Sequence, residues 1–392
     1  MHPVPGFKLG TACAGIKTPG RKDLVVMELS ESTSVAAVFT QNAFCAAPVT
    51  VAKQHLQSAT PRYLLINTGN ANAGTGDTGL ADARQSCEVL AELQSLSSSQ
   101  VLPFSTGVIG ESLPMDKLLA GIPQAVGALD ENGWADAAEG ILTTDTRPKG
   151  ASLQFSIEGA QLTITGITKG SGMIKPNMAT MLGFVATDAQ IDPELLNRAL
   201  RLVTNKSFNR ITVDSDTSTN DAVVLAATGA SGIVIDESNF DQFVANLETV
   251  FIELAQSIIR DGEGASKFVS VLVDSAEDSA EAVKVAYCIA ESPLVKTALA
   301  ASDANWGRIL AAVGRAGVDN LDVSKVSISL NQVLIVEQGG RAASYSEEAG
   351  EQAMAAEDIT IHVSLNRGTA VETVWTTDLT YEYVRINAEY RT

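Results

Sequence analysis

The sequence has few residues of the kinds that hold metals or form disulfide frameworks. Its 392 residues include three histidines and four cysteines, and no two cysteines have the Cys-x-x-Cys spacing of a metal or redox motif. We therefore expect no metal site. We also expect Cys13, Cys45, Cys87 and Cys288 to be buried free thiols in a reducing cytoplasm.

Positive charge and long apolar runs are scarce as well. The 46 acidic residues outnumber the 27 basic ones, and the net charge of −19 argues against a nucleic-acid partner, whose phosphates would be repelled. No apolar run approaches the ~20 residues that a membrane helix needs. The start, MHPVPGFKLG, lacks the basic-then-apolar pattern of a signal peptide. We expect a cytoplasmic protein with no membrane partner.

The apolar content and the length of the chain suit a large packed core. Apolar residues make up 45% of the chain, and its length exceeds one ordinary domain, so two or three compact units are expected. Residues 21–55 predict short β-strands, and 240–259 predict a long helix from their apolar spacing. Residues 281–392 are predicted to form a separate C-terminal unit.

Residues 169–182 read KGSGMIKPNMATML and join a turn-rich approach to an apolar strand. Gly170, Gly172 and Pro176 exclude a regular helix through the approach, and the strand begins at Thr180. A threonine hydroxyl is a weak nucleophile, but an N-terminal threonine can use its own α-amine as base. The pattern therefore suits a chain that cuts itself before Thr180. An ordinary surface loop has the same spacing, and spacing alone favours the loop.

Two other segments carry patterns with a chemical meaning. Thr106 and Gly107 follow a strand predicted to end at Ser105, and such a junction can aim donors at a developing oxyanion. An ordinary Ser/Thr turn has the same spacing. Residues 214–221, DSDTSTND, carry three acids, but the EF-hand pattern with its glycine and closing glutamate is absent, so we reject a calcium loop.

A third segment imitates a nucleotide-binding turn. Gly74, Gly76 and Gly79 match G-x-G-x-x-G between a predicted strand and a predicted helix. The motif does not follow the strand immediately, and no acidic residue closes a second strand about 20 residues on. We expect a tight glycine loop near the active site here. A nucleotide-binding oxidoreductase is the alternative that the motif leaves open.

The motifs together resemble the glutamate N-acetyltransferase (ornithine acetyltransferase) family of arginine biosynthesis. The resemblance covers nearly the whole chain, with its blocks in the family's order. The blocks are GFKLGTACAGIK, TQNAFCAAPV, LLINTGNANAGTGDTG, STGVIGE, TTDTRPK, KGSGMIKPNMATML, DSDTSTND, DGEGASKF, ANWGRILAAVGRAG and DLTYEYVRINAEYRT. It implies an α+β fold with sheets layered between helices, like an N-terminal-nucleophile enzyme, and a C-terminal α+β unit.

The resemblance also implies which residues act. Self-cleavage between Ala179 and Thr180 would give an α chain (1–179) and a β chain whose parts are 180–280 and 281–392. Thr180 would be the nucleophile, and Thr106 and Gly107 the oxyanion hole. The substrate-binding residues implied by matching each block are Thr143, Lys169, Thr180, Glu263, Asn387 and Thr392.

Some of these assignments leave alternatives. Thr144 lies one residue from Thr143, and Lys175 is as close in sequence to the cleavage segment as Lys169. The family often has serine at the position of Thr392, and threonine keeps a hydroxyl there.

The activity implied is transfer of the acetyl group from N2-acetyl-L-ornithine to L-glutamate through an acetyl-threonine intermediate, with no cofactor. The residues leave open whether acetyl-CoA is also accepted as a donor. The α and β chains would stay paired, commonly as a heterotetramer of two α and two β chains. A related self-processed aminopeptidase or amidase, in which water replaces glutamate, is the alternative.

Overall fold

The computed structural model describes residues 1–175 and 181–389, which divide into two compact units. The first unit contains Met1–Asn209 and Asp216–Ile258, and the second contains Arg210–Ser215 and the chain from Ile259 onward. The division therefore falls about twenty residues before the expected boundary at 281. The reason is that β13 (Phe268–Ala276) pairs with strands from the end of the chain.

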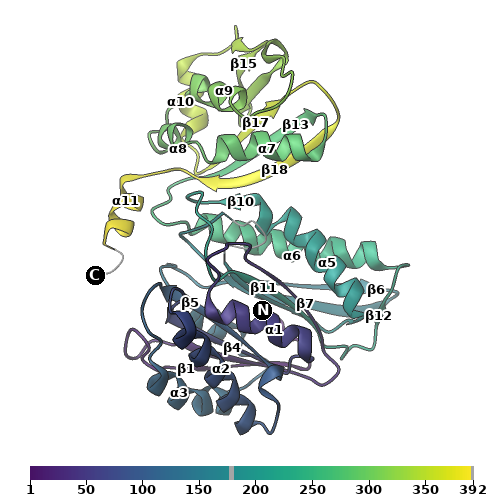
Figure 1. The fold of residues 1–392 in the computed structure, drawn as a ribbon. Helices are drawn as coiled ribbons and strands as arrows, with labels where there is room; N and C mark the ends of the chain where they lie inside the picture. Colours follow the sequence, from purple (N-terminus) through teal and green to yellow (C-terminus); the bar gives the residue numbers. More distant parts are fainter. Residues whose placement is uncertain (176–180, 390–392) are drawn as a thin grey trace. The chain divides into compact units, whose positions relative to one another are not determined.

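The first unit contains two main sheets (Figure 1). One has the order β1-β2-β4-β5 and the other the order β3-β11-β8-β7-β6, while β9 and β12 form a small parallel pair. The strands are β1 (Phe7–Ala12), β2 (Leu24–Leu29), β3 (Ser34–Phe39), β4 (Tyr63–Asn70), β5 (Val101–Val108), β6 (Lys149–Ile157), β7 (Ala160–Lys169), β8 (Leu182–Thr187), β9 (Gln190–Ile191), β11 (Ala222–Ala227) and β12 (Val234–Ile235).

Among residues 1–175 and 181–260, six α-helices accompany these sheets. They are α1 (Ala47–Ser58), α2 (Gly76–Leu93), α3 (Met115–Gly127), α4 (Trp134–Gly140), α5 (Pro193–Lys206) and α6 (Phe240–Arg260), and short 3₁₀ turns lie at Ser98–Gln100 and Phe208–Arg210. Asp192 is the N-cap of α5, because its carboxylate accepts a hydrogen bond of 2.8 Å from the Glu194 amide and Pro193 occupies the first turn.

The two sheets pack face to face between layers of helices. One core joins β2, β4 and β5 to β8 and β11, and Phe104 meets Phe184 edge to face across it, with ring centroids 5.2 Å apart. On the far side of the four-stranded sheet, a second core includes residues of α2 and α3. The helix α5 packs on β3 and β11 of the other sheet. These are the layered sheets between helices that the resemblance predicts.

The expectation of strands throughout residues 21–55 is wrong at its end. Residues from Ala47 to Ser58 form α1, whose first turn contains Pro48, with a fixed φ that suits a helix start. Val49 and Val51 favour strands by propensity, but both are fully buried against the sheets, and tertiary burial overrides a weak local preference.

The second unit is a seven-stranded sheet with helices on one face (Figure 1). The sheet order is β10-β18-β13-β17-β14-β15-β16. The elements are β10 (Ile211–Thr212), α7 (Ser279–Ala290), α8 (Pro293–Ala300), α9 (Trp306–Gly314), a 3₁₀ turn at Val323–Lys325, β14 (Ser327–Leu330), β15 (Val333–Glu337), β16 (Gly340–Arg341), α10 (Glu347–Met354), β17 (Asp358–Ser364), β18 (Ala370–Thr377) and α11 (Tyr381–Ala388).

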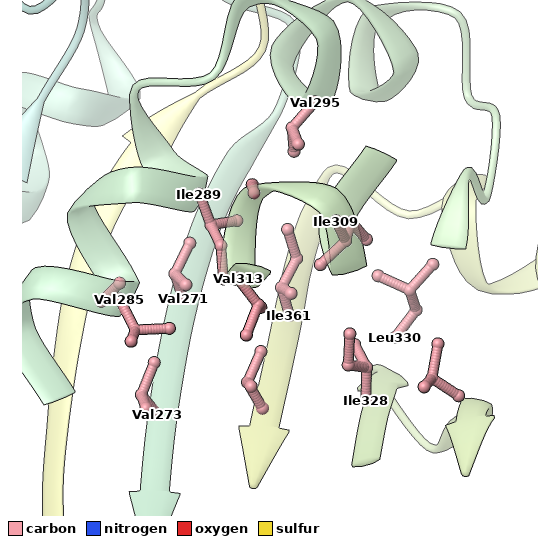
Figure 2. Packing of buried hydrophobic residues seen from close by; sticks show 14 of the residues in the cluster. Val271, Val273, Val285, Ile289, Val295, Ile309, Val313, Ile328, Leu330 and Ile361 are labelled. Atoms are coloured by element: carbon pink, nitrogen blue, oxygen red, sulfur yellow. The ribbon is translucent and has the colours of Figure 1, made fainter. Parts of the chain in front are cut away.

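An aliphatic core holds the second unit together. Figure 2 shows Val271 and Val273 of β13 and Ile361 of β17 facing Val285 and Ile289 of α7. Valine and isoleucine suit this position because branched side chains pack well on a pleated surface. The core explains why the chain from Ile259 onward is a unit of its own.

The structure also bears on two expectations from composition. Within residues 1–175 and 181–389, no helix is both long and apolar enough to cross a membrane. All four cysteines are free, but only Cys87 is buried, and Cys13 is exposed. The expectation that every thiol is buried is therefore wrong.

Candidate active site

Thr106 and Gly107 lie inside β5 rather than in a turn after it, which corrects the expected strand end at Ser105. The register between β4 and β5 shifts at Gly69 and Asn70, directly opposite this pair. Gly107 has a φ of +136°, and a Cβ added to it would lie 2.3 Å from the Gly69 carbonyl carbon. The strand can therefore make this irregular end only with glycine at position 107.

The Asn220 side chain holds the peptide that precedes Thr106. Its Nδ2 donates to the Ser105 carbonyl at 2.9 Å and to the Ala71 carbonyl at 2.6 Å, and Thr219 Oγ1 donates to its Oδ1 at 2.6 Å. The Ser105 carbonyl and the Thr106 N–H belong to one planar peptide, so fixing one orients the other. Sequence reasoning missed this role.

Lys169 ends β7 and brings three predicted site residues together. Its Nζ donates to Thr143 Oγ1 at 2.7 Å and to Thr106 Oγ1 at 3.3 Å. The neighbouring Thr144 hydroxyl instead lies 2.8 Å from Ser171 Oγ. Lys169 pairs in register with Leu182 of β8. The cluster of Lys169, Thr143 and Thr106 therefore lies beside the start of β8.

A buried carboxylate, Asp145, organises this cluster. Its Oδ1 accepts from Lys149 Nζ at 2.5 Å and from the Gly170 amide at 2.7 Å, and its Oδ2 accepts from the Thr143 amide at 3.0 Å. Lys169 Nζ lies 3.8 Å from Oδ2. Burial acts to raise the pKa of Asp145, but Lys169 and Lys149 outweigh it and hold that pKa well below its usual value. Asp145 stands in the TTDTRPK block, but nothing in the sequence singles it out.

We predict that Asp145→Asn lowers the free energy of unfolding by about 3–5 kcal/mol, because it breaks the buried ion pair between Asp145 and the Lys149 ammonium. Urea denaturation of uncleaved Thr180→Ala chains, with and without Asp145→Asn, measures the loss. Asp136→Asn is the matched control, since it removes one carboxylate from an exposed pair with Lys22 and should cost at most about 1 kcal/mol. Equal losses in the two variants would contradict this account.

The second unit brings together two further predicted residues. Asn387 on α11 donates from Nδ2 to Glu263 Oε2 at 2.8 Å. Glu263 is mostly buried, in the loop between α6 and β13. Asp378 fastens that loop, because its carboxylate accepts from the Ser266 amide at 2.9 Å, the Lys267 amide at 3.1 Å and the Ser266 hydroxyl. Sequence reasoning missed Asp378.

Three predicted residues, Ala179, Thr180 and Thr392, lie outside the described part of the chain. The alternative lysine, Lys175, is described, and its backbone carbonyl accepts a hydrogen bond of 3.4 Å from Thr217 Oγ1. The lysine that bonds Thr106 and Thr143 is Lys169.

The glycine motif at residues 74–79 does not form an open phosphate cradle. The side chain of Asn72, which has a φ of +46°, fills the turn: its Nδ2 donates to the Gly79 carbonyl at 2.9 Å, and its Oδ1 accepts from Thr75 Oγ1 at 2.8 Å. A Cβ on Gly79 would lie 1.8 Å from Thr75 Oγ1. Close packing therefore accounts for this glycine. Among the described residues, no group of three or more His, Cys, Asp or Glu side chains is placed to hold a metal.

The layered α+β fold, with its irregular strand end at Thr106 and Gly107 beside the Lys169 ammonium, suits an enzyme of the acyl-transfer class. A family model, described as the ArgJ family, matches residues 8–392. The chain belongs to the ArgJ family. Over its whole length it is 58% identical to the arginine biosynthesis bifunctional protein ArgJ of Pseudomonas syringae pv. tomato and 56% identical to that of Methylococcus capsulatus. It covers 98% and 97% of those proteins.

Two solved structures are similar to parts of this chain. A chain of the ArgJ protein from Bacillus halodurans is 42% identical with a TM-score of 0.52, and the match covers 53% of this chain and 99% of that one. A chain of the ornithine acetyltransferase of Mycobacterium tuberculosis, solved with ornithine, is 35% identical, with a TM-score of 0.40, over 45% of this chain and 94% of that one. As a member of the ArgJ family, matched over residues 8–392, this chain is an acetyltransferase of arginine biosynthesis, as the motifs predicted.

Proposed function

We propose that this chain moves the acetyl group of N2-acetyl-L-ornithine to L-glutamate, with Thr180 as nucleophile. The observation that carries the proposal is the position of Lys169. It contacts Thr106 and Thr143 and pairs with Leu182, two residues after Thr180. Predicted oxyanion and substrate residues therefore gather beside the segment that follows the predicted nucleophile.

The reaction is proposed to run in two halves. Thr180 Oγ attacks the acetyl carbonyl carbon while its hydroxyl proton passes to the Thr180 α-amine. The Thr106–Gly107 strand end holds the oxyanion. The carbon–nitrogen bond then breaks, the proton goes to the departing amine of ornithine, and an acetyl-threonine ester remains. The amine of glutamate attacks the ester, and Thr180 leaves with its hydroxyl restored.

The proposed cut between Ala179 and Thr180 frees the α-amine that this route needs. The part after the cut has 213 of the 392 residues, about 54% of the chain. The solved Bacillus halodurans chain is matched almost completely by 53% of this chain, a share that fits one product of such a cut. The α and β chains are proposed to remain paired, as a cytoplasmic heterotetramer.

The amino-acid portion shared by both substrates is proposed to bind Thr143, Lys169, Glu263, Asn387 and Thr392. An ammonium such as that of Lys169 suits the substrate carboxylate, and a carboxylate such as that of Glu263 suits the substrate ammonium. No cofactor is proposed, and acetyl-CoA is proposed as a second acetyl donor for glutamate.

An assay with two acceptors tests the function. Purified enzyme with N-acetylornithine should form N-acetylglutamate when glutamate is present and release little acetate when it is absent. Acetate release at the same rate without glutamate would mean that water is the acceptor, as in an amidase. Replacing N-acetylornithine by acetyl-CoA in the same assay tests the second donor.

We predict that Asp378→Ala raises the KM for both amino-acid substrates about tenfold or more and changes kcat less. The variant leaves the Ser266 and Lys267 amides without an acceptor, at a cost of about 1–3 kcal/mol, and so releases the loop that carries Glu263. Steady-state kinetics measures both constants. Asp322→Ala is the control, since that exposed acid caps only a 3₁₀ turn. A lower kcat with an unchanged KM would contradict the role of Asp378.

A further inference from the structure

Asp221 lies against the residue that follows the proposed nucleophile. It directly precedes β11, whose Ala222 pairs with Leu182 of β8. The Ala222 amide donates to the Met181 carbonyl at 3.0 Å, and the Asp221 carboxyl accepts a hydrogen bond from the Met181 amide. Both polar backbone groups of Met181 are therefore held by this short segment.

The Asp221 side chain is buried and only partly satisfied. The residue is 3% exposed, and its Oδ2 has no hydrogen-bond partner within the part of the chain that the structure describes. Burial raises the pKa of Asp221 well above its usual value, while bonds from Ser218 and Met181 and the charge of Lys169 act in the opposite direction. A buried carboxyl oxygen without a hydrogen-bond partner lowers the free energy of unfolding, so its presence calls for a functional explanation.

Other charged groups near this acid are already engaged. The Lys169 ammonium, on β7, lies beside Asp145, which also bonds Lys149. Lys53 of α1 donates to the Thr40 carbonyl at 3.4 Å, and the Thr40 amide donates to the Asp221 carbonyl. Protonation of its own carboxyl is thus the direct way for Asp221 to avoid a buried charge.

We propose that Asp221 carries the proton in self-cleavage, an inference that rests on the proposed cut before Thr180. Met181 directly follows Thr180 in the chain, so the carboxyl that accepts from the Met181 amide is one peptide unit in sequence from the bond that is proposed to break. The nitrogen of that bond must gain a proton to leave. Asp221 acts as an acid on the chain's own peptide bond.

In the proposed step one bond forms as another breaks, and the acid recovers the proton that it gives. The Thr180 hydroxyl oxygen bonds to the Ala179 carbonyl carbon as the Ala179–Thr180 carbon–nitrogen bond breaks. Asp221 gives its proton to the departing nitrogen, and the hydroxyl proton of Thr180 restores the acid. Water then opens the ester, leaving a carboxylate on Ala179 and a free hydroxyl and amine on Thr180.

A time course of cleavage tests the proposal. Chains are made in a pulse of cell-free translation, and the intact and cut forms are followed on denaturing gels. Asp221→Asn keeps the shape and an oxygen acceptor for the Met181 amide but cannot pass on a proton, so it should cut about 100-fold or more slowly. The matched control is Asp188→Asn, since Asp188 is also buried and accepts from a backbone amide, that of Thr163, at 2.8 Å. Asp188 lies after the far end of β8, so the Asp188→Asn chain should cut at the wild-type rate.

A second variant separates proton transfer from folding. Asp221→Glu keeps the acid but forces an extra methylene into a packed site, so a purely structural role would make it the worse of the two substitutions. We expect Asp221→Glu to cut faster than Asp221→Asn. If Asp221→Asn cuts as fast as Asp221→Glu or the wild type, the proposal fails while the cut itself stands. If the wild type does not cut, the proposed function fails first and the role of Asp221 with it.

Discussion

Thr180→Ala is expected to leave the chain in one piece and to lower acetyl transfer below about one ten-thousandth of the wild-type rate. The substitution removes the oxygen that attacks both the Ala179 carbonyl and the acetyl group, and loss of a nucleophile has effects of this size. Gel electrophoresis of the purified variant measures cleavage, and formation of N-acetylglutamate measures transfer. A Thr180→Ala variant that is cut and fully active would rule out Thr180 as the nucleophile.

Thr180→Ser is the matched variant for that experiment. It keeps the hydroxyl and removes only the methyl group, so it should still cut and should retain far more transfer than Thr180→Ala. If serine and alanine behave alike, the defect would lie in the fit of the side chain and not in the missing nucleophile.

Gly107→Ala is expected to lower kcat by about 10²–10³, the size of effect seen when one oxyanion donor is lost. A Cβ at this position would lie 2.3 Å from the Gly69 carbonyl carbon and 2.5 Å from the Asn70 nitrogen, and the φ of +136° is strained for any other residue. The β4–β5 contact must open, which moves Thr106. Steady-state kinetics on cleaved protein measures the change.

Gly127→Ala provides the control. Gly127 ends α3, and an added Cβ there meets no atom within 4 Å, so alanine should leave kcat unchanged. Should Gly107→Ala keep the kcat of this control, the Thr106–Gly107 strand end would not be the oxyanion site.

Much of the fold could be predicted because its strands and helices carry periodic apolar patterns. The helix at Phe240–Arg260, for example, lies within one residue of the range 240–259 that its apolar spacing predicts. The helix α11 could not be found in that way, because it has no buried residue and so no apolar stripe. Its start depends on Thr380, whose hydroxyl accepts from the Glu382 and Tyr383 amides.

The sequence could indicate a site residue only where the residue type itself suggests a chemical role. A glycine-flanked glutamate or a threonine after a turn can be noticed in a sequence, whereas the roles of Asp145, Asn220 and Asp378 depend on which distant amides and ammonium groups surround them. The alternatives Thr143 and Thr144 differ in side-chain direction. The structure turns Thr143 towards Lys169, and no spacing rule gives that result.

The most direct test of the account is the denatured mass of the purified protein, with N-terminal sequencing of every fragment. Self-cleavage before Thr180 predicts two fragments of 179 and 213 residues, the second beginning Thr-Met-Leu-Gly. A single intact chain that still transfers acetyl groups from N-acetylornithine would contradict it, because Thr180 would then have no free α-amine to act as base.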